Sequence, residues 1–239
     1  MSANMINVLT KREWTLLISI IVYSFIPAFG GLIRLLELAG GPALIPENPR
    51  VLADPLPVIL HIFSSFTFCV AGAVQFLPSV RHHHLLIHRA IGRVIVIAGC
   101  VSAASGLWMT YFYAFPEALQ GSLLFSTRII LSVLMIGLIG WAVLAIRAGN
   151  VFQHGASMLR AYAIGQGAST QTLIGIGWII ILGAEPTGFL RDAFMLVCWL
   201  LNMLAAEILI YRFITNTNSP VQTSIKDGKQ LNALPSHEL

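Results

Sequence analysis

Six long apolar stretches alternate with short polar segments along this 239-residue chain. Each stretch is close to the roughly 20 residues that an α-helix needs to cross about 30 Å of hydrocarbon. The pattern therefore predicts six transmembrane helices, over Trp14–Leu36, Val58–Leu77, Ala90–Ala114, Leu123–Ile146, Ser157–Leu182 and Phe189–Ile214. Residues 1–13 are then a cytoplasmic N-terminal segment, residues 14–214 the membrane domain, and residues 215–239 a polar tail whose composition predicts disorder.

The composition agrees with a chain that is embedded in lipid. Hydrophobic residues make up 56% of the sequence and charged residues only 10%. A soluble domain of this size would be left without a polar surface, so soluble protein classes are excluded and no nucleic-acid partner is expected. The expected fold class is all-α, a polytopic transmembrane helical bundle whose first partner is the lipid bilayer.

Basic and acidic residues gather at opposite ends of the predicted helices. The basic end carries Lys11, Arg12, Arg81 to Arg93, Arg147, Arg212, Lys226 and Lys229. The opposite end carries Glu37, Glu47, Asp54, Glu117, Glu185 and Asp192, with only Arg50 and Arg191. Because short loops rich in Lys and Arg remain in the cytoplasm, this asymmetry predicts that both termini are cytoplasmic, in a bacterial inner membrane.

A few ionisable side chains remain inside the apolar stretches, where a charge costs roughly 2.5 to 3.5 kcal/mol even on lenient insertion scales. On the cytoplasmic side, Arg160 and Glu207 lie at a similar depth, about 8 to 9 Å, which predicts an ion pair with Gln75 near the same level. On the outer side, His61 and Arg128 have no carboxylate at equal depth. Loop carboxylates or a bound anion are their expected partners.

Small and polar residues along one face predict that the second, third and fifth spans form the inner bundle. His88 and His154 begin two of these helices on the cytoplasmic side. A haem iron needs two axial ligands from facing helices, and arginines suit its propionates. This predicts a cofactor site that consists of His88, His154, Arg89, Arg93 and Arg160, with haem as one hypothesis. His84 and His88 have a spacing that can hold a metal, but no metal site is predicted from spacing alone.

Several of these residues belong to a longer pattern. It runs from His61 through Gly72, Gln75 and Phe76, continues with His88-Arg89 and Gly92-Arg93, and ends in HGASMLRAYAIGQGAST from His154. Over roughly residues 55–182 this pattern resembles an uncharacterised bacterial membrane family, the domain of unknown function twenty-three-oh-six. The resemblance implies a polytopic membrane protein and supplies no reaction. Family members usually carry a further arginine where this chain has Gln171 and Thr172. If that arginine completes a site, the resemblance implies that this chain lacks the corresponding activity.

Three functions from different classes remain open at this point. The first is a haem-binding or redox-linked membrane protein, and the second is a small-molecule or proton-coupled transporter. The third is an assembly subunit that binds another membrane protein or a second copy of itself. The chain has no phosphate-binding glycine loop, no HExxH motif and no nucleophile elbow, which disfavours hydrolases and nucleotide-driven pumps. The sequence does not decide whether the protein is an enzyme.

Overall fold

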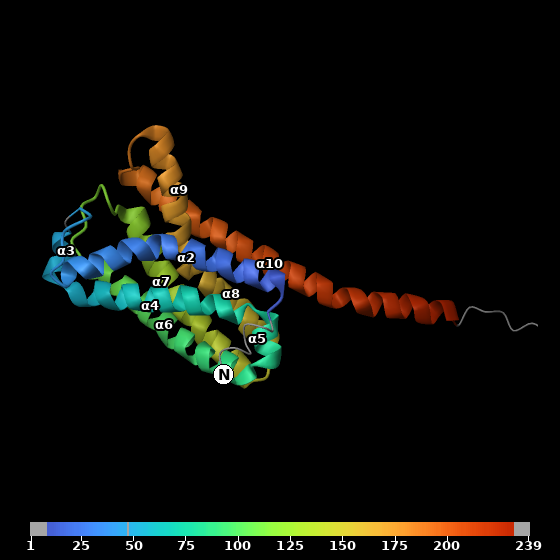
Figure 1. Ribbon diagram of the computed structural model, residues 1–239. Helices are drawn as coiled ribbons and strands as arrows, with labels where there is room; N and C mark the ends of the chain where they lie inside the picture. Colours follow the sequence, from blue (N-terminus) through green and yellow to red (C-terminus); the bar gives the residue numbers. More distant parts are fainter. Residues whose placement is uncertain (1–8, 47, 232–239) are drawn as a thin grey trace, which may run out of the picture.

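The computed structural model describes residues 9–46 and 48–231, with side chains through residue 212. Helices and loops make up all of this part of the chain (Figure 1). The helices are α2 (Lys11–Leu38), α3 (Pro49–Ala53), α4 (Pro55–Gln75), α5 (Pro78–His83), α6 (Leu85–Phe112), α7 (Ser122–Arg147), α8 (Val151–Gly165), α9 (Gly167–Leu182) and α10 (Gly188–Leu231). The predicted N-terminal segment, residues 1–13, and its predicted cytoplasmic location fall partly on residues 1–8, which lie outside the described residues.

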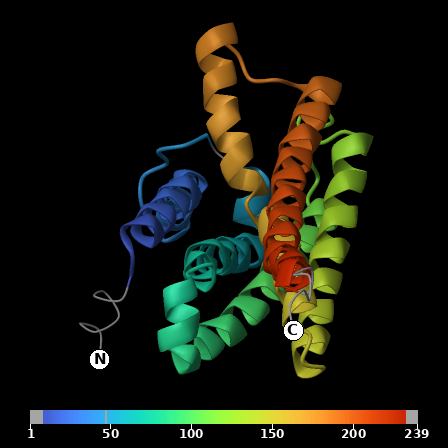
Figure 2. The same ribbon diagram turned by 90° about the vertical axis from the view of Figure 1, so that its right-hand side faces the viewer.

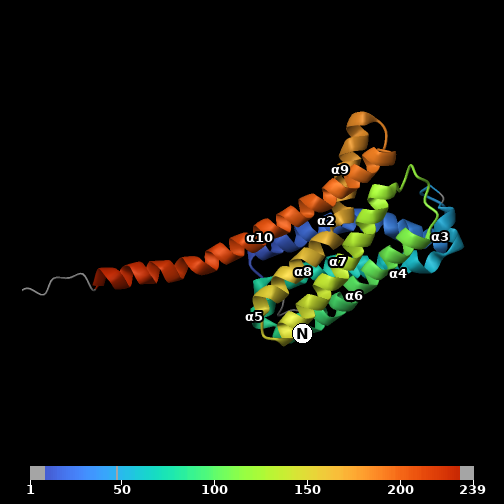
Figure 3. The same ribbon diagram turned by 180° about the vertical axis from the view of Figure 1, so that it is seen from behind.

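Five helices are long and apolar enough to cross a membrane: α2, α4, α6, α7 and the Gly188–Arg212 part of α10. This confirms the predicted all-α polytopic bundle. The structure differs from the prediction in the fifth span, because the continuous helix expected over Ser157–Leu182 is instead two helices. α8 has 15 residues and α9 has 16, and they meet at Gln166. From this point α9 leaves the direction of α8 (Figures 1 and 3).

Four helices form a closed ring around the core. α4 packs on α6, α6 on α7, α7 on α8, and α8 on α4, so α6 and α8 lie on the diagonal of this ring. α2 covers α4, while α10 covers α8. The inner bundle therefore includes α4, α6 and the α8 half of the predicted fifth span, with α7 as well, while α9 lies outside the ring against α2 and α10. Figure 2 looks onto the end where α5 lies and where α6 and α8 begin.

Glycines allow the ring helices to approach closely around Phe68. A Cβ atom at Gly99 would lie 2.7 Å from Phe68 Cε2 and 2.6 Å from Ile139 Cδ1. A Cβ atom at Gly165 would lie 2.8 Å from Phe68 Cε1. These distances are shorter than van der Waals contact, so the packing of α4, α6, α7 and α8 depends on small residues, as in other membrane bundles.

The N-terminus of α7 is capped by a side chain from another helix. Asp192 of α10 is 2% exposed, and its carboxylate accepts hydrogen bonds from the backbone N–H groups of Gly121, at 3.1 Å, and Leu124, at 3.0 Å. Gly121 is the N-cap residue and has no side chain that could accept these donors. Asp192 therefore supplies, from another helix of the same chain, the hydrogen-bond acceptor that an N-cap side chain normally supplies.

We expect Asp192→Ala to lower the free energy of unfolding by about 2 to 4 kcal/mol, since two buried N–H groups lose their acceptor. Thermal unfolding of the detergent-solubilised protein would measure the effect as a lower Tm. Glu185→Ala is the matched control, because the Glu185 side chain is 66% exposed and pairs only loosely with Arg191. Equal losses in the two variants would show that the cap does not stabilise the fold.

The last helix extends far beyond the bundle (Figure 1). α10 continues to Leu231, while its side chains beyond Arg212 and all of residues 232–239 lie outside the described part of the chain. The prediction that residues 215–239 form a disordered tail stays a prediction.

Candidate functional site

His154 lies in the first turn of α8, four residues after the N-cap residue Asn150. Asn150 caps this helix by accepting a hydrogen bond from Gln153 N at 3.0 Å. The His154 Nδ1 atom is 3.0 Å from the carbonyl oxygen of Ala142 in α7. Because a carbonyl oxygen can only accept, Nδ1 carries the proton, and in the neutral ring Nε2 has the lone pair. This is the arrangement that orients a ligating histidine towards a metal or haem iron.

His88 lies in the first turn of α6, across the diagonal from α8. Its Nδ1 atom is buried without a hydrogen-bond partner, and so is Nε2 of His84, the N-cap residue of the same helix. The backbone oxygen of His88 accepts a hydrogen bond from Gln75 Nε2 at 3.2 Å, which ties α4 to the start of α6. His88 lies within electrostatic range of His154. The two predicted ligands therefore lie at the same end of the bundle.

The arginines predicted for this site point elsewhere. Arg89 and Arg93 are on the exposed face of α6, one turn apart. Arg160 forms the expected ion pair with Glu207 of α10, with Nε 2.5 Å from Oε1 and Nη2 2.8 Å from Oε2. The two side chains are 30% and 47% exposed, so the pair lies on the outside of the α8–α10 contact. The two histidines and Arg89 therefore lie at the same end of the bundle, while Arg160 is turned towards Glu207.

The outer polar residues form a second group. The His61 Nδ1 atom is 3.0 Å from the carbonyl oxygen of Ser102 and 3.2 Å from Ser105 Oγ. These contacts hold the imidazole of His61, in α4, against α6. Arg128 of α7 donates a hydrogen bond to the Gln120 side chain. His61 lies in the opposite half of the bundle from His88 and His154. It therefore does not belong to the same site.

Sequence reasoning missed the polar joint between α8 and α9. The helix break leaves three backbone oxygens without their usual helical donors, and side chains from neighbouring helices supply the replacement. Asn202 Nδ2 donates to Ala163 O at 3.2 Å, and Trp199 Nε1 donates to Ile164 O at 3.2 Å. The Cys69 thiol donates to Gly165 O at 3.7 Å. Such replacement is required wherever a helix is interrupted inside a membrane protein.

The Gln166 side chain is at the centre of this joint. Its Nε2 atom donates to Ser24 Oγ at 2.7 Å and to Tyr162 Oη at 2.8 Å, while its Oε1 atom accepts from Ser169 Oγ at 2.8 Å. The Tyr162 hydroxyl in turn donates to Cys69 O at 2.6 Å. Gln166 is 5% exposed. The available signal was a polar residue between two glycines, Gly165 and Gly167, inside an apolar run.

Histidine, cysteine and carboxylate side chains do not gather in threes around a metal position anywhere in the described ranges. A haem needs only two protein ligands, so the pair of histidines is the arrangement left to consider.

Comparison with known proteins gives one result. A family model described as "Predicted membrane protein (DUF2306)" matches residues 58–210, a segment that contains both histidines, Gln166 and Glu207. No curated protein and no solved structure gives a significant match.

Proposed function

The chain belongs to the DUF2306 family of predicted membrane proteins, which establishes an integral membrane protein without a reaction, and from its site we propose that it binds haem between His88 and His154. The asymmetry of basic residues supports a bacterial cell membrane with both termini in the cytoplasm, which puts this site at the cytoplasmic end.

The observation that carries the proposal is the state of the two rings. His154 is held in one tautomer by Ala142 O and keeps a lone pair on Nε2, while His88 has a buried ring nitrogen without a partner. A buried polar atom that lacks a hydrogen bond costs free energy, and iron bound to Nδ1 of His88 itself would remove that cost. The two imidazoles come from α6 and α8, which lie on the diagonal of the four-helix ring. Helical bundles hold cofactors between facing helices of this kind.

Neighbouring residues of the chain fit the same role. Gly92 lies one turn after His88, and a Cβ atom there would meet only Gln75 Oε1, at 3.5 Å. The helix face beside His88 therefore adjoins the Gln75 side chain of α4. Arg89 and Arg93 lie at the bundle surface near this end and would meet propionates there rather than inside the bundle. When bound, haem would supply one-electron chemistry at its iron.

Visible absorption of the detergent-purified protein tests the proposal. Protein from haem-sufficient cells is expected to show a Soret band that shifts on reduction, with about one iron per chain, as for a single bis-histidine haem. A colourless protein that contains no iron would contradict it.

A transporter is the second candidate, because transporters often place substrates at interrupted helices near the middle of the membrane. The α8–α9 joint is such an interruption. Its carbonyl oxygens already have donors from Asn202, Trp199 and Cys69, which favours a structural joint over a substrate site. Liposomes that contain the protein and a pH-sensitive dye test the proton-coupled form of this candidate. Decay of an imposed pH gradient no faster than in empty liposomes would remove it.

A further inference from the structure

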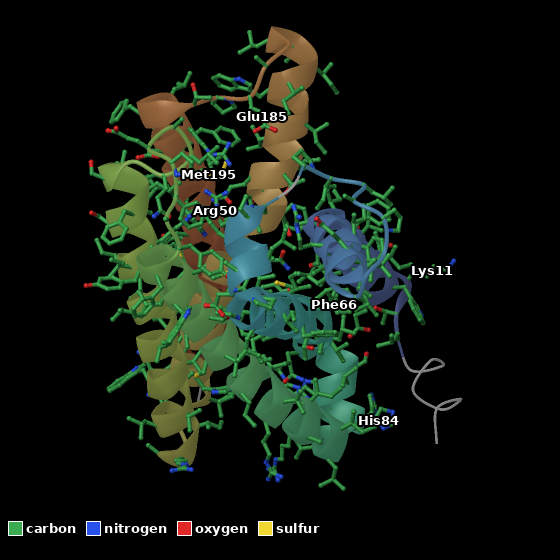
Figure 4. All side chains as sticks on the ribbon, turned by 90° about the vertical axis from the view of Figure 1, so that its left-hand side faces the viewer. Lys11, Arg50, Phe66, His84, Glu185 and Met195 are labelled. Atoms are coloured by element: carbon green, nitrogen blue, oxygen red, sulfur yellow. The ribbon has the colours of Figure 1, made fainter. Side chains whose placement is uncertain are left out.

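Three arginines converge at the outer end of the bundle, opposite to the histidine site. We call Arg50 of α3, Arg128 of α7 and Arg191 of α10 the outer arginine cluster. The Cζ atom of Arg50 is 4.6 Å from the centre of the Phe115 ring, and that of Arg128 is 5.4 Å from the same point. Arg191 lies within electrostatic range of Arg128. Figure 4 looks onto this end of the bundle and labels Arg50.

The carboxylates near the cluster leave it short of negative charge. Asp192 is buried and lies within electrostatic range of Arg128, while both of its oxygens also accept backbone N–H groups at the start of α7, so two carboxylates, Asp192 and Glu185, face three guanidinium groups. Glu185 reaches Arg191 Nη1 at 3.3 Å, but its side chain is 66% exposed, so water screens this contact strongly. Like charges held close together in a medium of low dielectric repel one another, which makes this gathering costly without a further anion.

The hydrogen-bond donors of the cluster are also incompletely used. Within the described residues, Arg128 donates only to the neutral side chain of Gln120. The Nε atom of Arg191 is buried and has no hydrogen-bond partner. Arg50 differs, since its Nε atom donates to Asn48 Oδ1 at 3.0 Å. Two of the three guanidinium groups, those of Arg128 and Arg191, therefore have N–H groups without a protein partner among the described residues.

We propose that the outer arginine cluster binds a phosphate-type oxyanion, either the phosphodiester of a lipid headgroup or free phosphate. Guanidinium groups match the geometry of phosphate oxygens and bind them with two parallel hydrogen bonds. The cluster lies at the helix ends, the depth at which lipid phosphates occur in a bilayer. The proposal does not depend on haem, because the two sites use different residues at opposite ends of the bundle.

Binding is tested with the full chain, stripped of lipid in a neutral detergent. Its Tm is measured with added inorganic phosphate, with phosphatidylglycerol, and with a neutral glycolipid of the same acyl chains. We expect phosphate or phosphatidylglycerol to raise the Tm and the glycolipid to have no effect. A response to inorganic phosphate identifies a soluble anion as a ligand. A response to phosphatidylglycerol alone identifies the lipid headgroup.

Variants assign the response to the cluster. Arg128→Gln and Arg191→Gln should each weaken binding at least about tenfold, because a charge-assisted hydrogen bond is lost in each. Without any anion, Arg128→Gln should be at least as stable as the wild type, since it removes an unneutralised charge. Arg147→Gln is the control, because Arg147 is exposed at the other end of α7 and should leave the response unchanged.

Two results would overturn the proposal. One is a Tm that neither phosphate nor phosphatidylglycerol changes, or changes equally in the wild type and in both cluster variants. The other is a response that is seen only in Glu47→Gln. Glu47 is three residues before Arg50 in the sequence, and such a result would make the chain itself the source of the neutralising anion. Because Arg191→Gln alters a residue outside the ring helices, it keeps the test interpretable if Arg128→Gln does not fold.

Discussion

Replacing His154 or His88 with alanine is expected to abolish the Soret band of the purified protein and to reduce its iron content to background. An axial histidine contributes one of two bonds to the iron, and alanine has no atom that can replace it. His154→Ala also removes the hydrogen bond between the imidazole and Ala142 O. Each variant would be compared with the wild type by absorption spectroscopy in the oxidised and reduced states.

Three other histidine variants make this test specific. His82→Ala and His83→Ala alter exposed residues at the same end of the bundle, and His61→Ala alters the histidine in the opposite half. All three are expected to retain the band. Size-exclusion chromatography of the colourless variants would show whether they remain folded and monodisperse. Retention of haem in both His88→Ala and His154→Ala would refute the proposed ligands.

Gln166→Leu is expected to cause a large loss of stability. The substitution removes one acceptor and two donor interactions, with Ser169, Ser24 and Tyr162. Hydrogen bonds between membrane helices contribute on average roughly 0.6 kcal/mol each and at most about 1.7 kcal/mol, so the loss of three should lower the free energy of unfolding by about 2 to 4 kcal/mol. Thermal unfolding in detergent would measure it.

Gln171→Leu provides the matched control for this prediction. Gln171 is the same residue type only five positions later, but its side chain makes one hydrogen bond, to Met195 O at 3.3 Å. It should therefore cost much less. A second variant, Gly167→Ala, tests the joint without changing a polar group, because its Cβ atom would lie 1.9 Å from Trp199 Nε1 and displace the donor to Ile164 O. If Gln166→Leu and Gln171→Leu were equally stable, the joint would not be a stabilising element.

Hydropathy predicts most of this fold because the membrane restricts the alternatives. An apolar segment in lipid must satisfy its own backbone, so a run of suitable length is a helix almost by necessity. The break at Gln166 escapes such reasoning. The side chains that donate to the carbonyl oxygens at this break, Trp199 and Asn202, come from α10, more than thirty residues later. Only the folded structure brings them next to these oxygens.

The sequence predicts the depth of the candidate site residues in the membrane, but not the helix face on which each side chain lies. Counting residues from the helix ends correctly predicted that Arg160 and Glu207 would meet. The same count placed Arg160 near His154, although six residues rotate a side chain by about 600°, and thus to a different face of α8. Arg89 and Arg93 share a depth with His88 but lie on the exposed face of α6. The face is fixed by contacts with other helices, which a single sequence does not report.

The dependence of earlier helices on α10 has a consequence for biosynthesis. α7, α8 and α9 leave the ribosome before α10, yet the acceptor for the first turn of α7 and two donors for the α8–α9 joint are on α10, at Asp192, Trp199 and Asn202. Until α10 is inserted, these backbone groups must be satisfied by water or by the insertion machinery. A nascent chain that stops before residue 188 would therefore contain every ring helix and still be unable to complete the fold.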